Sequence, residues 1–122
     1  MTAREAAGPH SWKHEPAPAQ REPLGFSAHY DAAMVARMRL GEIPADMDDR
    51  WFIYFDAGWL RFHRSWTGVW IYALQMQDDG QGGWNVVDSW VNRDPTQYRM
   101  EDIPADRESL ARMIDYRFTP KP

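Results

Sequence analysis

The chain has 122 residues, a formal net charge of -4 and no cysteine. The absence of cysteine excludes disulfides, a thiol nucleophile and a thiolate metal site. The acidic balance argues against non-specific nucleic-acid binding, which depends on many Lys and Arg side chains to neutralise phosphates. A mean hydropathy of -0.69 without a long apolar run excludes a membrane span. The first nine residues lack the apolar stretch of a secretory signal, so we expect a cytoplasmic protein.

Residues 1–25 are rich in Ala, Pro and Glu, with prolines at positions 9, 16, 18 and 23. Large apolar residues are too few here to offset the entropy lost on ordering. We therefore predict that residues 1–25 form a disordered tail with Trp12 as its only anchor. Residues 26–119 are expected to form a single α+β domain.

A first helix is expected between Ser27, a plausible N-cap, and Gly41, a plausible stop. Tyr30, Met34 and Met38 recur between them at helical spacing and form a narrow apolar stripe. The sequence Ile-Pro-Ala-Asp over residues 43–46 then ends the helical pattern.

The next part of the chain predicts an antiparallel meander over residues 51–55, 59–64, 69–76 and 84–91. The first segment is apolar on both faces, which predicts a central strand of the sheet. Gly58 suits a hairpin turn that needs a positive φ. In the second segment, alternation places Leu60, Phe62 and Arg64 on one face, and Trp59, Arg61 and His63 on the other.

A last helix is expected to begin at Asp106 as N-cap and to end at Pro120. Its buried stripe would consist of Leu110, Met113, Ile114 and Phe118. The whole pattern predicts an α+β fold, a four-stranded antiparallel meander with an N-terminal and a C-terminal helix packed on one face.

The bend after the second strand gathers the most varied polar chemistry of the chain. This bend contains, in successive residues, an imidazole, a guanidinium, two hydroxyls, an indole and a glycine. Arg64 can donate two parallel hydrogen bonds to an anionic group. Trp66 offers a flat ring face, and Gly68 permits close backbone approach. We therefore predict a ligand-binding corner for a phosphate-bearing, nucleotide-like or ADP-ribose-like molecule. Its predicted residues are His63, Arg64, Ser65, Trp66, Thr67 and Gly68, aided by Asn92 and Arg93. The alternative is a stabilising turn.

Catalysis at this corner would depend on His63 as the base. An orienting acid would be required, and Asp56 and Asp88 are the nearest candidates in topology. Ser65 lies two residues on, roughly 7 Å away along a strand, which is too long for the hydrogen bond that activates a serine. An enzyme is therefore the less favoured reading.

No metal site and no cofactor are predicted. Asp46, Asp48 and Asp49 lack the calcium-loop pattern, and the prolines around His10 and His14 do not support a helix that would pair them on a metal.

The seven tryptophans include five at alternating strand positions, as expected of core or cross-strand aromatic residues. Some of them must lie on the sheet face away from the helices, and a patch left uncovered there would mark a protein interface. The Trp59, Arg61, His63 alternation is also typical of a platform for single-stranded nucleic acid, which the acidic balance disfavours.

Two segments carry a resemblance to a known family. The first is Arg50-Trp51-Phe52-Ile53-Tyr54-Phe55, continuing through Gly58-Trp59-Leu60 and Phe62-His63-Arg64-Ser65-Trp66-Thr67-Gly68 to Ile71-Tyr72; the second is Trp90-Val91-Asn92-Arg93-Asp94-Pro95-Thr96-Gln97-Tyr98. Over residues 42–98 the chain resembles a small bacterial family whose members carry the name ADP-ribosylation/crystallin J1. The resemblance implies a shared fold and a connection with ADP-ribose, without an established activity. The true ADP-ribosylglycohydrolases are larger helical proteins with metal-binding carboxylates, and this chain has neither their length nor their motifs.

Three functions follow from these observations. The first is an accessory or binding protein that holds a small phosphate-bearing ligand at the corner. The second is a protein-interaction module with a protein partner, such as an immunity protein or an antitoxin. The third is a hydrolase of ADP-ribose or nucleotide linkages with His63 as base. Neither a nucleic acid nor a membrane is an expected partner.

Overall fold

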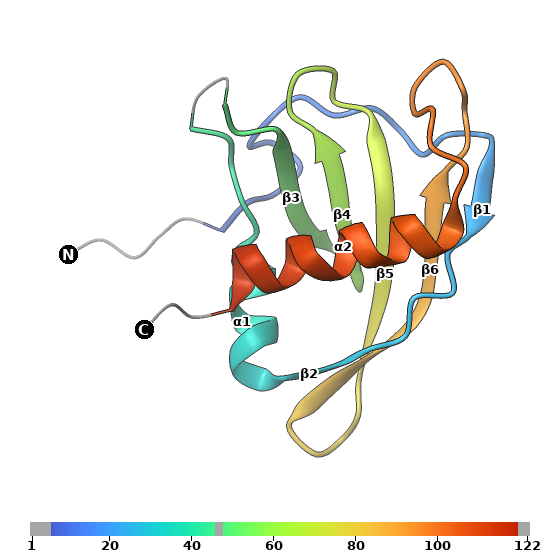
Figure 1. The fold of residues 1–122 in the computed structure, drawn as a ribbon. Helices are drawn as coiled ribbons and strands as arrows, with labels where there is room; N and C mark the ends of the chain where they lie inside the picture. Colours follow the sequence, from blue (N-terminus) through green and yellow to red (C-terminus); the bar gives the residue numbers. More distant parts are fainter. Residues whose placement is uncertain (1–5, 46–47, 120–122) are drawn as a thin grey trace.

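The computed structural model describes residues 6–45 and 48–119, and its centre is an antiparallel sheet (Figure 1). The four longest strands are β3 (Trp51–Asp56), β4 (Trp59–Arg64), β5 (Trp70–Asp78) and β6 (Gly83–Asn92). They pair antiparallel in chain order, as the sequence predicts. The β3–β4 turn is formed by Ala57 and Gly58, whose φ angles are 51° and 85°. Positive φ at both central residues is the requirement of a type I′ hairpin turn.

The sheet has six strands rather than the predicted four. The additional strands are β1 (Arg21–Pro23) and β2 (His29–Asp31), and both pair antiparallel with β6. Each has three residues, too few to show an alternating pattern in the sequence. They form because the outer edge of β6 would otherwise leave a row of backbone N–H and C=O groups unpaired.

The segment before β2 is packed on the domain, which corrects the predicted disordered tail for residues 6–25. Leu24 is fully buried and Ala7 nearly so. Backbone hydrogen bonds hold both residues, from Leu24 N to Ser89 O at 3.0 Å and from Ala7 N to Leu40 O at 2.7 Å. Composition did not predict this packing, because it reports the number of apolar side chains but not the backbone hydrogen bonds that a segment forms. The first five residues of that predicted tail lie outside the described residues.

Helix α1 spans Ala32–Leu40 and ends at Gly41, as predicted. Its N-cap is Asp31 and not Ser27, because residues 29–31 are paired with β6 as a strand. The Asp31 carboxylate accepts a hydrogen bond from Met34 N at 2.8 Å, which satisfies one of the free N–H groups of the first turn.

Helix α2 spans Ile103–Phe118 and begins one turn earlier than the sequence predicts. Its N-cap is Asp102, whose side chain accepts a hydrogen bond from Ala105 N. A proline in the first turn is compatible with this start, because its missing N–H would have no partner there. Asp106, predicted as the cap, is a fully buried residue of the first turn. Pro120, the predicted end, lies outside the described residues.

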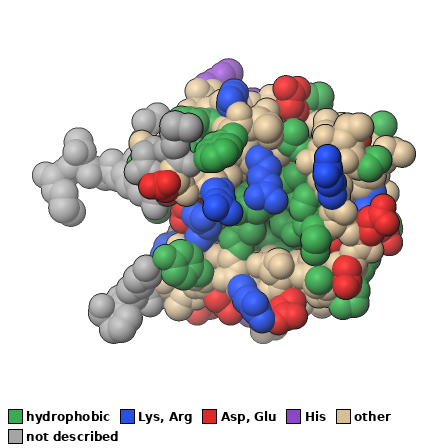
Figure 2. Space-filling view, turned by 45° about the horizontal axis from the view of Figure 1, so that its top comes forward, with side chains coloured by type: hydrophobic (Ala, Val, Ile, Leu, Met, Phe, Trp, Pro, Cys, Tyr) green, Lys and Arg blue, Asp and Glu red, His purple; other side chains and the backbone are tan. Residues whose placement is uncertain are grey.

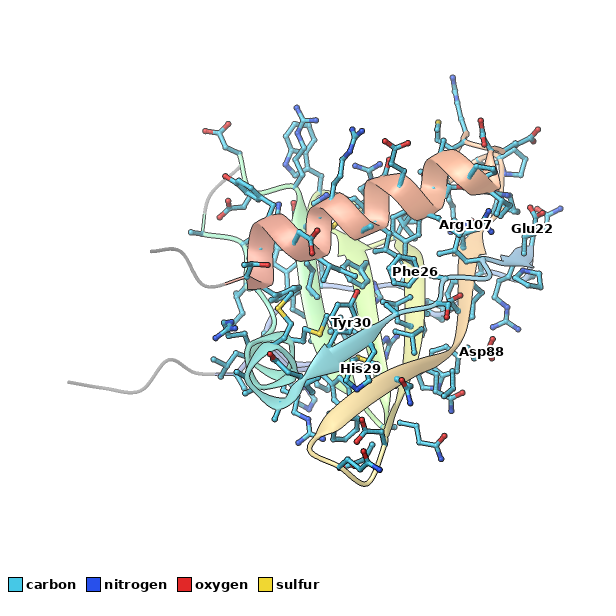
Figure 3. The ribbon with its side chains drawn as sticks, turned by 60° about the horizontal axis from the view of Figure 1, so that its bottom comes forward. Glu22, Phe26, His29, Tyr30, Asp88 and Arg107 are labelled. Atoms are coloured by element: carbon cyan, nitrogen blue, oxygen red, sulfur yellow. The ribbon has the colours of Figure 1, made fainter. Side chains whose placement is uncertain are left out.

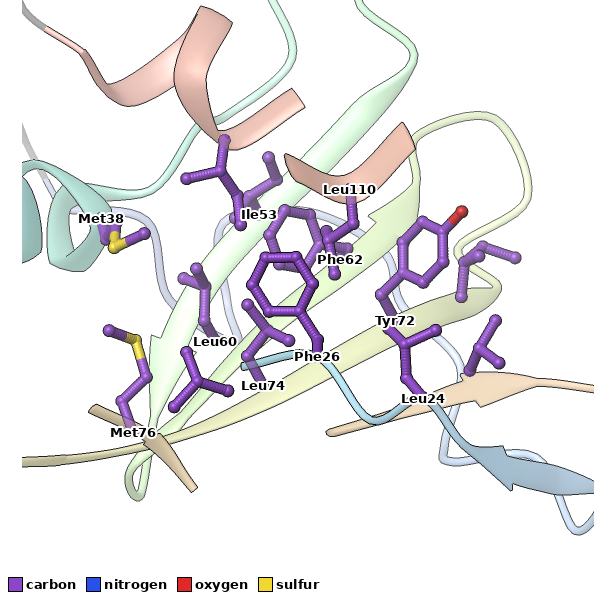
Figure 4. Packing of buried hydrophobic residues seen from close by; sticks show 14 of the residues in the cluster. Leu24, Phe26, Met38, Ile53, Leu60, Phe62, Tyr72, Leu74, Met76 and Leu110 are labelled. Carbon is purple, nitrogen blue, oxygen red and sulfur yellow. The ribbon is translucent and has the colours of Figure 1, made fainter. Parts of the chain in front are cut away.

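Both helices contribute side chains to one hydrophobic cluster on the sheet (Figure 4). Val35 and Met38 enter it from α1, and Leu110, Ile114 and Phe118 enter it from α2. Phe26 and Leu24, from the segment between β1 and β2, complete the cluster. Arg107 of α2 lies over this segment and donates a hydrogen bond to Leu24 O at 3.2 Å (Figure 3).

The opposite face of the sheet is also partly covered. Phe52 and Tyr54 are fully buried there beneath the chain's N-terminal segment, which we call the strap (residues 6–20). Ala7 and Trp12 of the strap pack against these two rings. In Figure 1 the strap runs behind the sheet on its way to β1. Strand β3 lies at the edge of the sheet and not at its centre, which corrects the prediction of a central strand. Its apolar sequence reflects burial on both faces, with Ile53 in the cluster under the helices and Phe52 and Tyr54 beneath the strap.

Replacing Gly41 by alanine is expected to lower the free energy of unfolding by roughly 3 kcal/mol, through a left-handed φ and a steric clash together. The φ of Gly41 is 63°, and an added Cβ would lie 2.1 Å from Ile53 O. Gly80→Ala is the matched control, since Gly80 has a φ of 79° but open space around it; it should cost about 1 kcal/mol. Urea unfolding of both variants tests this, and equal losses would contradict it.

Candidate functional site

The predicted corner is the turn that joins β4 to β5. Two backbone hydrogen bonds close it, from Arg64 N to Val69 O and from Gly68 N to Arg64 O, both 2.8 Å long. Gly68 has a φ of 79°, and a Cβ at this position would lie 3.0 Å from His14 Cα. Glycine is required here both for the backbone conformation and for the close approach of the strap.

The strap holds this turn from behind through the carbonyl groups of the turn. The indole N–H of Trp12 donates to Ser65 O at 2.8 Å, and the backbone N–H of Glu15 donates to Gly68 O at 2.8 Å. Residues far apart in the sequence thus fix the shape of the corner.

The structure divides the predicted site residues between the two faces of the sheet. His63 is fully buried among Phe52, Tyr54 and Trp70 on the strap side. Arg64 lies on the helix side, with its guanidinium 4.6 Å from the centre of the Trp51 ring. This is the alternation that the sequence predicts for β4, and it means that His63 and Arg64 face different surroundings.

His63 is held as a neutral imidazole. Its Nδ1 lies 2.9 Å from Gly68 O, and since a carbonyl only accepts, Nδ1 carries the proton. Its Nε2 is buried without a hydrogen-bond partner among the described residues. Burial lowers the pKa of His63 to about 4, with the nearby Arg61 and His14 as smaller causes; the Gly68 hydrogen bond acts in the opposite direction.

Ser65 is a structural residue of the turn. It is nearly fully buried, and its hydroxyl donates to Asp49 O at 2.6 Å. His63 Nδ1 is committed to Gly68 O, so His63 and Ser65 make no pair in which one activates the other. Ser65 is therefore not a nucleophile that His63 could activate.

The exposed part of the corner lines a cavity of about 340 Å³ between the turn, the start of β3 and the loop after β6. Its lining residues are Arg50, Arg64, Trp66, Thr67 and Gln97. We call it the arginine cavity. Trp66 is 61% exposed, so its ring is accessible from solvent. Figure 2 shows the end of the molecule that carries this turn, with basic side chains gathered over a partly apolar surface and acidic side chains toward its periphery.

Asn92 is predicted as a ligand-binding residue, but its side chain holds the loop after β6. The amide of Asn92 donates to Trp70 O and to the Gln97 side chain, each at 2.9 Å, and its oxygen accepts from Asp94 N at 2.7 Å. Through Gln97, Asn92 positions one wall of the arginine cavity without lining it.

Arg93, also predicted as a ligand-binding residue, forms internal ion pairs instead. Its guanidinium donates to the fully buried Asp106 at 2.7 Å and to Glu22 at 2.8 Å. Tyr98 and Tyr72 donate to the same Asp106 carboxylate, at 2.6 and 3.3 Å. Burial, followed by the hydrogen bond to Asp106, raises the pKa of Tyr98. This network fastens α2 to β5 and to the loop after β6.

Arg50 and Gln97 line the cavity but are not among the site residues predicted from the sequence. Arg50 could have been found from the hairpin register: the turn at Ala57 and Gly58 pairs Trp51 with Arg64, and one further step places Arg50 opposite Ser65. Their backbones do meet, with Ser65 N donating to Arg50 O at 2.9 Å. Gln97 lies in a loop whose path no local pattern specifies.

Within residues 6–45 and 48–119, no group of three or more His, Asp or Glu side chains is arranged to hold a metal ion. Asp49 instead accepts a hydrogen bond from Ala45 N at 2.8 Å, and Asp46 lies outside the described residues. Neither α1 nor α2 combines the length and apolar character that a helix needs to cross a bilayer.

The geometry defines an α+β protein with a basic, aromatic cavity at one end of its sheet. No protein-family model, no curated protein and no solved structure matches the chain.

Substituting Arg93 by alanine should lower the free energy of unfolding by about 3–5 kcal/mol, because it leaves the Asp106 carboxylate buried without its cation. Arg112→Ala is the matched control, because Arg112 forms an exposed ion pair with Glu108. The exposed fractions of the two side chains are 78% and 63%. That control should cost less than about 1 kcal/mol. Chemical unfolding of both variants measures the difference, and similar costs would refute the structural role of Arg93.

The buried His63 should make the protein acid-sensitive in a defined range. Its folded pKa of about 4 lies below its ordinary value of 6.5, so between these pH values the unfolded chain binds more protons. The free energy of unfolding should therefore fall, by up to about 3 kcal/mol, as the pH decreases from 6.5 to 4.

His63→Phe removes this titration and keeps a ring in the aromatic cluster. The difference in unfolding free energy between wild type and variant should change with pH in that range and stay constant above pH 7. A difference independent of pH would show that His63 titrates normally, as would an imidazole NMR titration with a midpoint above 6.

Proposed function

We propose that the protein binds a small phosphate-bearing ligand with a planar ring, of the nucleotide or ADP-ribose class, in the arginine cavity. The observation that carries this proposal is the composition of the cavity lining: two guanidinium groups, an indole, a hydroxyl and an amide, with no acidic residue among the described lining residues. Guanidinium groups recognise phosphate through paired, charge-assisted hydrogen bonds.

Each lining group has a role in this proposal. Arg64 and Arg50 pair with the phosphate, and Trp66 stacks on the ring. Arg64 is held against Trp51, so less side-chain entropy is lost when it binds. Thr67 Oγ1 accepts a hydrogen bond from Val69 N at 3.2 Å, which leaves its own O–H to donate to a phosphate oxygen.

The cavity volume limits the size of the ligand. About 340 Å³ is near the lower end of the roughly 300–1,000 Å³ of small-molecule sites. A mononucleotide, or one end of ADP-ribose, suits this volume. The sequence resemblance to proteins named for ADP-ribosylation is the reason to include ADP-ribose among the probes.

The geometry favours binding over hydrolysis. His63, the base of the hydrolase hypothesis, is fully buried on the sheet face opposite Arg64. A ligand held by Arg64 and Trp66 would therefore be out of reach of the His63 imidazole.

The binding test uses the full chain, because the strap holds the corner. The probes are AMP, ADP-ribose, inorganic phosphate and adenosine, followed by thermal shift and calorimetric titration. AMP or ADP-ribose at 100 Kd should stabilise the protein by about 2.7 kcal/mol, which corresponds to a rise in Tm of several degrees. Adenosine, which lacks the phosphate, should bind at least tenfold more weakly.

Two variants and a control assign the binding to the cavity. Trp66→Ala should weaken AMP binding by about 1–3 kcal/mol through lost stacking, and the exposure of Trp66 should keep the fold intact. Arg64→Gln should reduce affinity at least tenfold, and Arg112→Gln, on the exposed side of α2, should leave it unchanged. Equal affinities of these two arginine variants, or no response to any phosphate compound, would contradict the proposal. The protein-interaction function then becomes the better explanation.

A further inference from the structure

A second hollow lies on the sheet face opposite the helices. It has a volume of about 330 Å³, and its lining residues are Arg21, Asp56, Ala57, Trp59, Arg61, Trp70 and Trp90. An adjoining hollow of about 420 Å³ along β1 and β6 shares Arg21, Trp59 and Trp90 with it. We call the first of these the tryptophan hollow.

Strand register explains how this hollow forms. Arg61 of β4 and Trp90 of β6 lie on either side of Ala73 of β5, which pairs with both. A methyl group between two large side chains leaves a depression in the sheet surface. A register shift between Phe62 and His63 pairs His63 with Trp70, so Trp70 shares this face and packs at 4.8 Å from Trp90, measured between ring centres.

Arg61 is the unusual group of the hollow. Its guanidinium carbon lies 3.7 Å from the ring centre of Trp70 and 4.8 Å from that of Tyr54. Burial lowers its pKa. Its Nε is buried without a hydrogen-bond partner, and no carboxylate of the described residues forms an ion pair with it.

Stacking leaves the hydrogen-bonding edge of this guanidinium available. The N–H donors of arginine lie in the plane of the group, so aromatic rings that cover its faces do not satisfy them. The Nε–H of Arg61 has lost hydration without gaining an acceptor, a state that an oxyanion bound at this edge relieves.

The neighbouring groups add a second charge and flat walls. Arg21 stacks on Trp90 at 5.4 Å from its ring centre, so both cations of the hollow are held against indoles. Asp56 also lines the hollow and raises the pKa of Arg61 through its charge, without forming an ion pair with it.

We propose that the tryptophan hollow binds an organic anion in which a carboxylate or phosphate is joined to a planar ring. The Arg61 edge takes the oxyanion, with Arg21 as the second cation. Trp59 and Trp90 provide the surface on which the ring stacks. This site is separate from the arginine cavity, which lies at the end of the sheet and on its helix side, and it does not depend on the proposed function.

The test is an NMR titration of the ¹⁵N-labelled full chain with benzoate, phenyl phosphate and benzamide. Arginine Nε–H and tryptophan indole N–H signals report on the hollow directly. Benzoate or phenyl phosphate should shift the Arg61 Nε–H signal and the indole signals of Trp59 and Trp90, and the tighter of the two identifies the oxyanion. Benzamide, neutral and of the same shape as benzoate, should bind at least tenfold more weakly.

Four variants complete the test. Arg61→Gln should abolish the benzoate-induced shifts of the Trp59 and Trp90 indole signals. Arg64→Gln, in the arginine cavity, should leave these shifts unchanged. Asp56→Asn should tighten benzoate binding severalfold, because it removes the competing carboxylate. Arg61→Lys keeps the charge but loses the planar fork, so it should also weaken binding; together with the wild-type comparison of benzoate and benzamide, it decides the matter if Arg61→Gln does not fold.

Several results would overturn this assignment. Equal affinity for benzoate and benzamide would make the hollow an apolar surface and not an anion site. Binding of choline in preference to benzoate would make Asp56 and the indoles a cation site. If no probe changed the NMR signal of Arg61 Nε–H, the hollow would not be an anion-binding site.

Discussion

The alternation of side chains along β4 is the constraint on which the rest of the molecule depends. Because helices cover one face of the sheet and the strap covers part of the other, adjacent residues of this strand meet unlike surroundings. His63 becomes a buried neutral ring and Arg64 a partly exposed cation, although they are neighbours in sequence. A slip of one residue in the pairing would exchange these environments. The arginine cavity and the tryptophan hollow are both consequences of this register.

The Gly68 carbonyl connects the buried residues beneath the β4–β5 turn to the exposed residues of that turn. This single oxygen accepts from the His63 imidazole and from the Glu15 backbone. The imidazole and the strap therefore both determine how the turn presents Trp66 and Thr67 to solvent. On the other wall of the arginine cavity, Asn92 holds Gln97 in position by a hydrogen bond. Buried polar groups can thus hold an exposed site in one shape through the hydrogen bonds that they make.

The central meander could be predicted from the sequence because its information is local. Apolar runs, alternation and the turn at Ala57 and Gly58 specify β3 and β4 with little help from distant residues. The starts of both helices could not be predicted, because Ser27 and Asp106 are chemically sound caps that long-range pairing overrides. Ser27 precedes a segment that pairs with β6 as a strand, and Asp106 is drawn into the interior by Arg93. Within the corner, the sequence indicated the accessible residues Arg64, Trp66 and Thr67, but it could not tell them from the supporting residues, since burial there depends on contacts with distant segments.

The position of the strap at the beginning of the chain has a consequence for biosynthesis. Trp12 leaves the ribosome well before Ser65, its hydrogen-bond partner 53 residues later, and β1 is made long before the β6 strand with which it pairs. The face formed by Phe52, Tyr54 and His63 is thus completed only when a segment made early folds back on a sheet made late. Contacts so distant in sequence form slowly. The nascent chain therefore holds its aromatic surface uncovered at least until the turn between β4 and β5, to which the strap is hydrogen-bonded, has emerged.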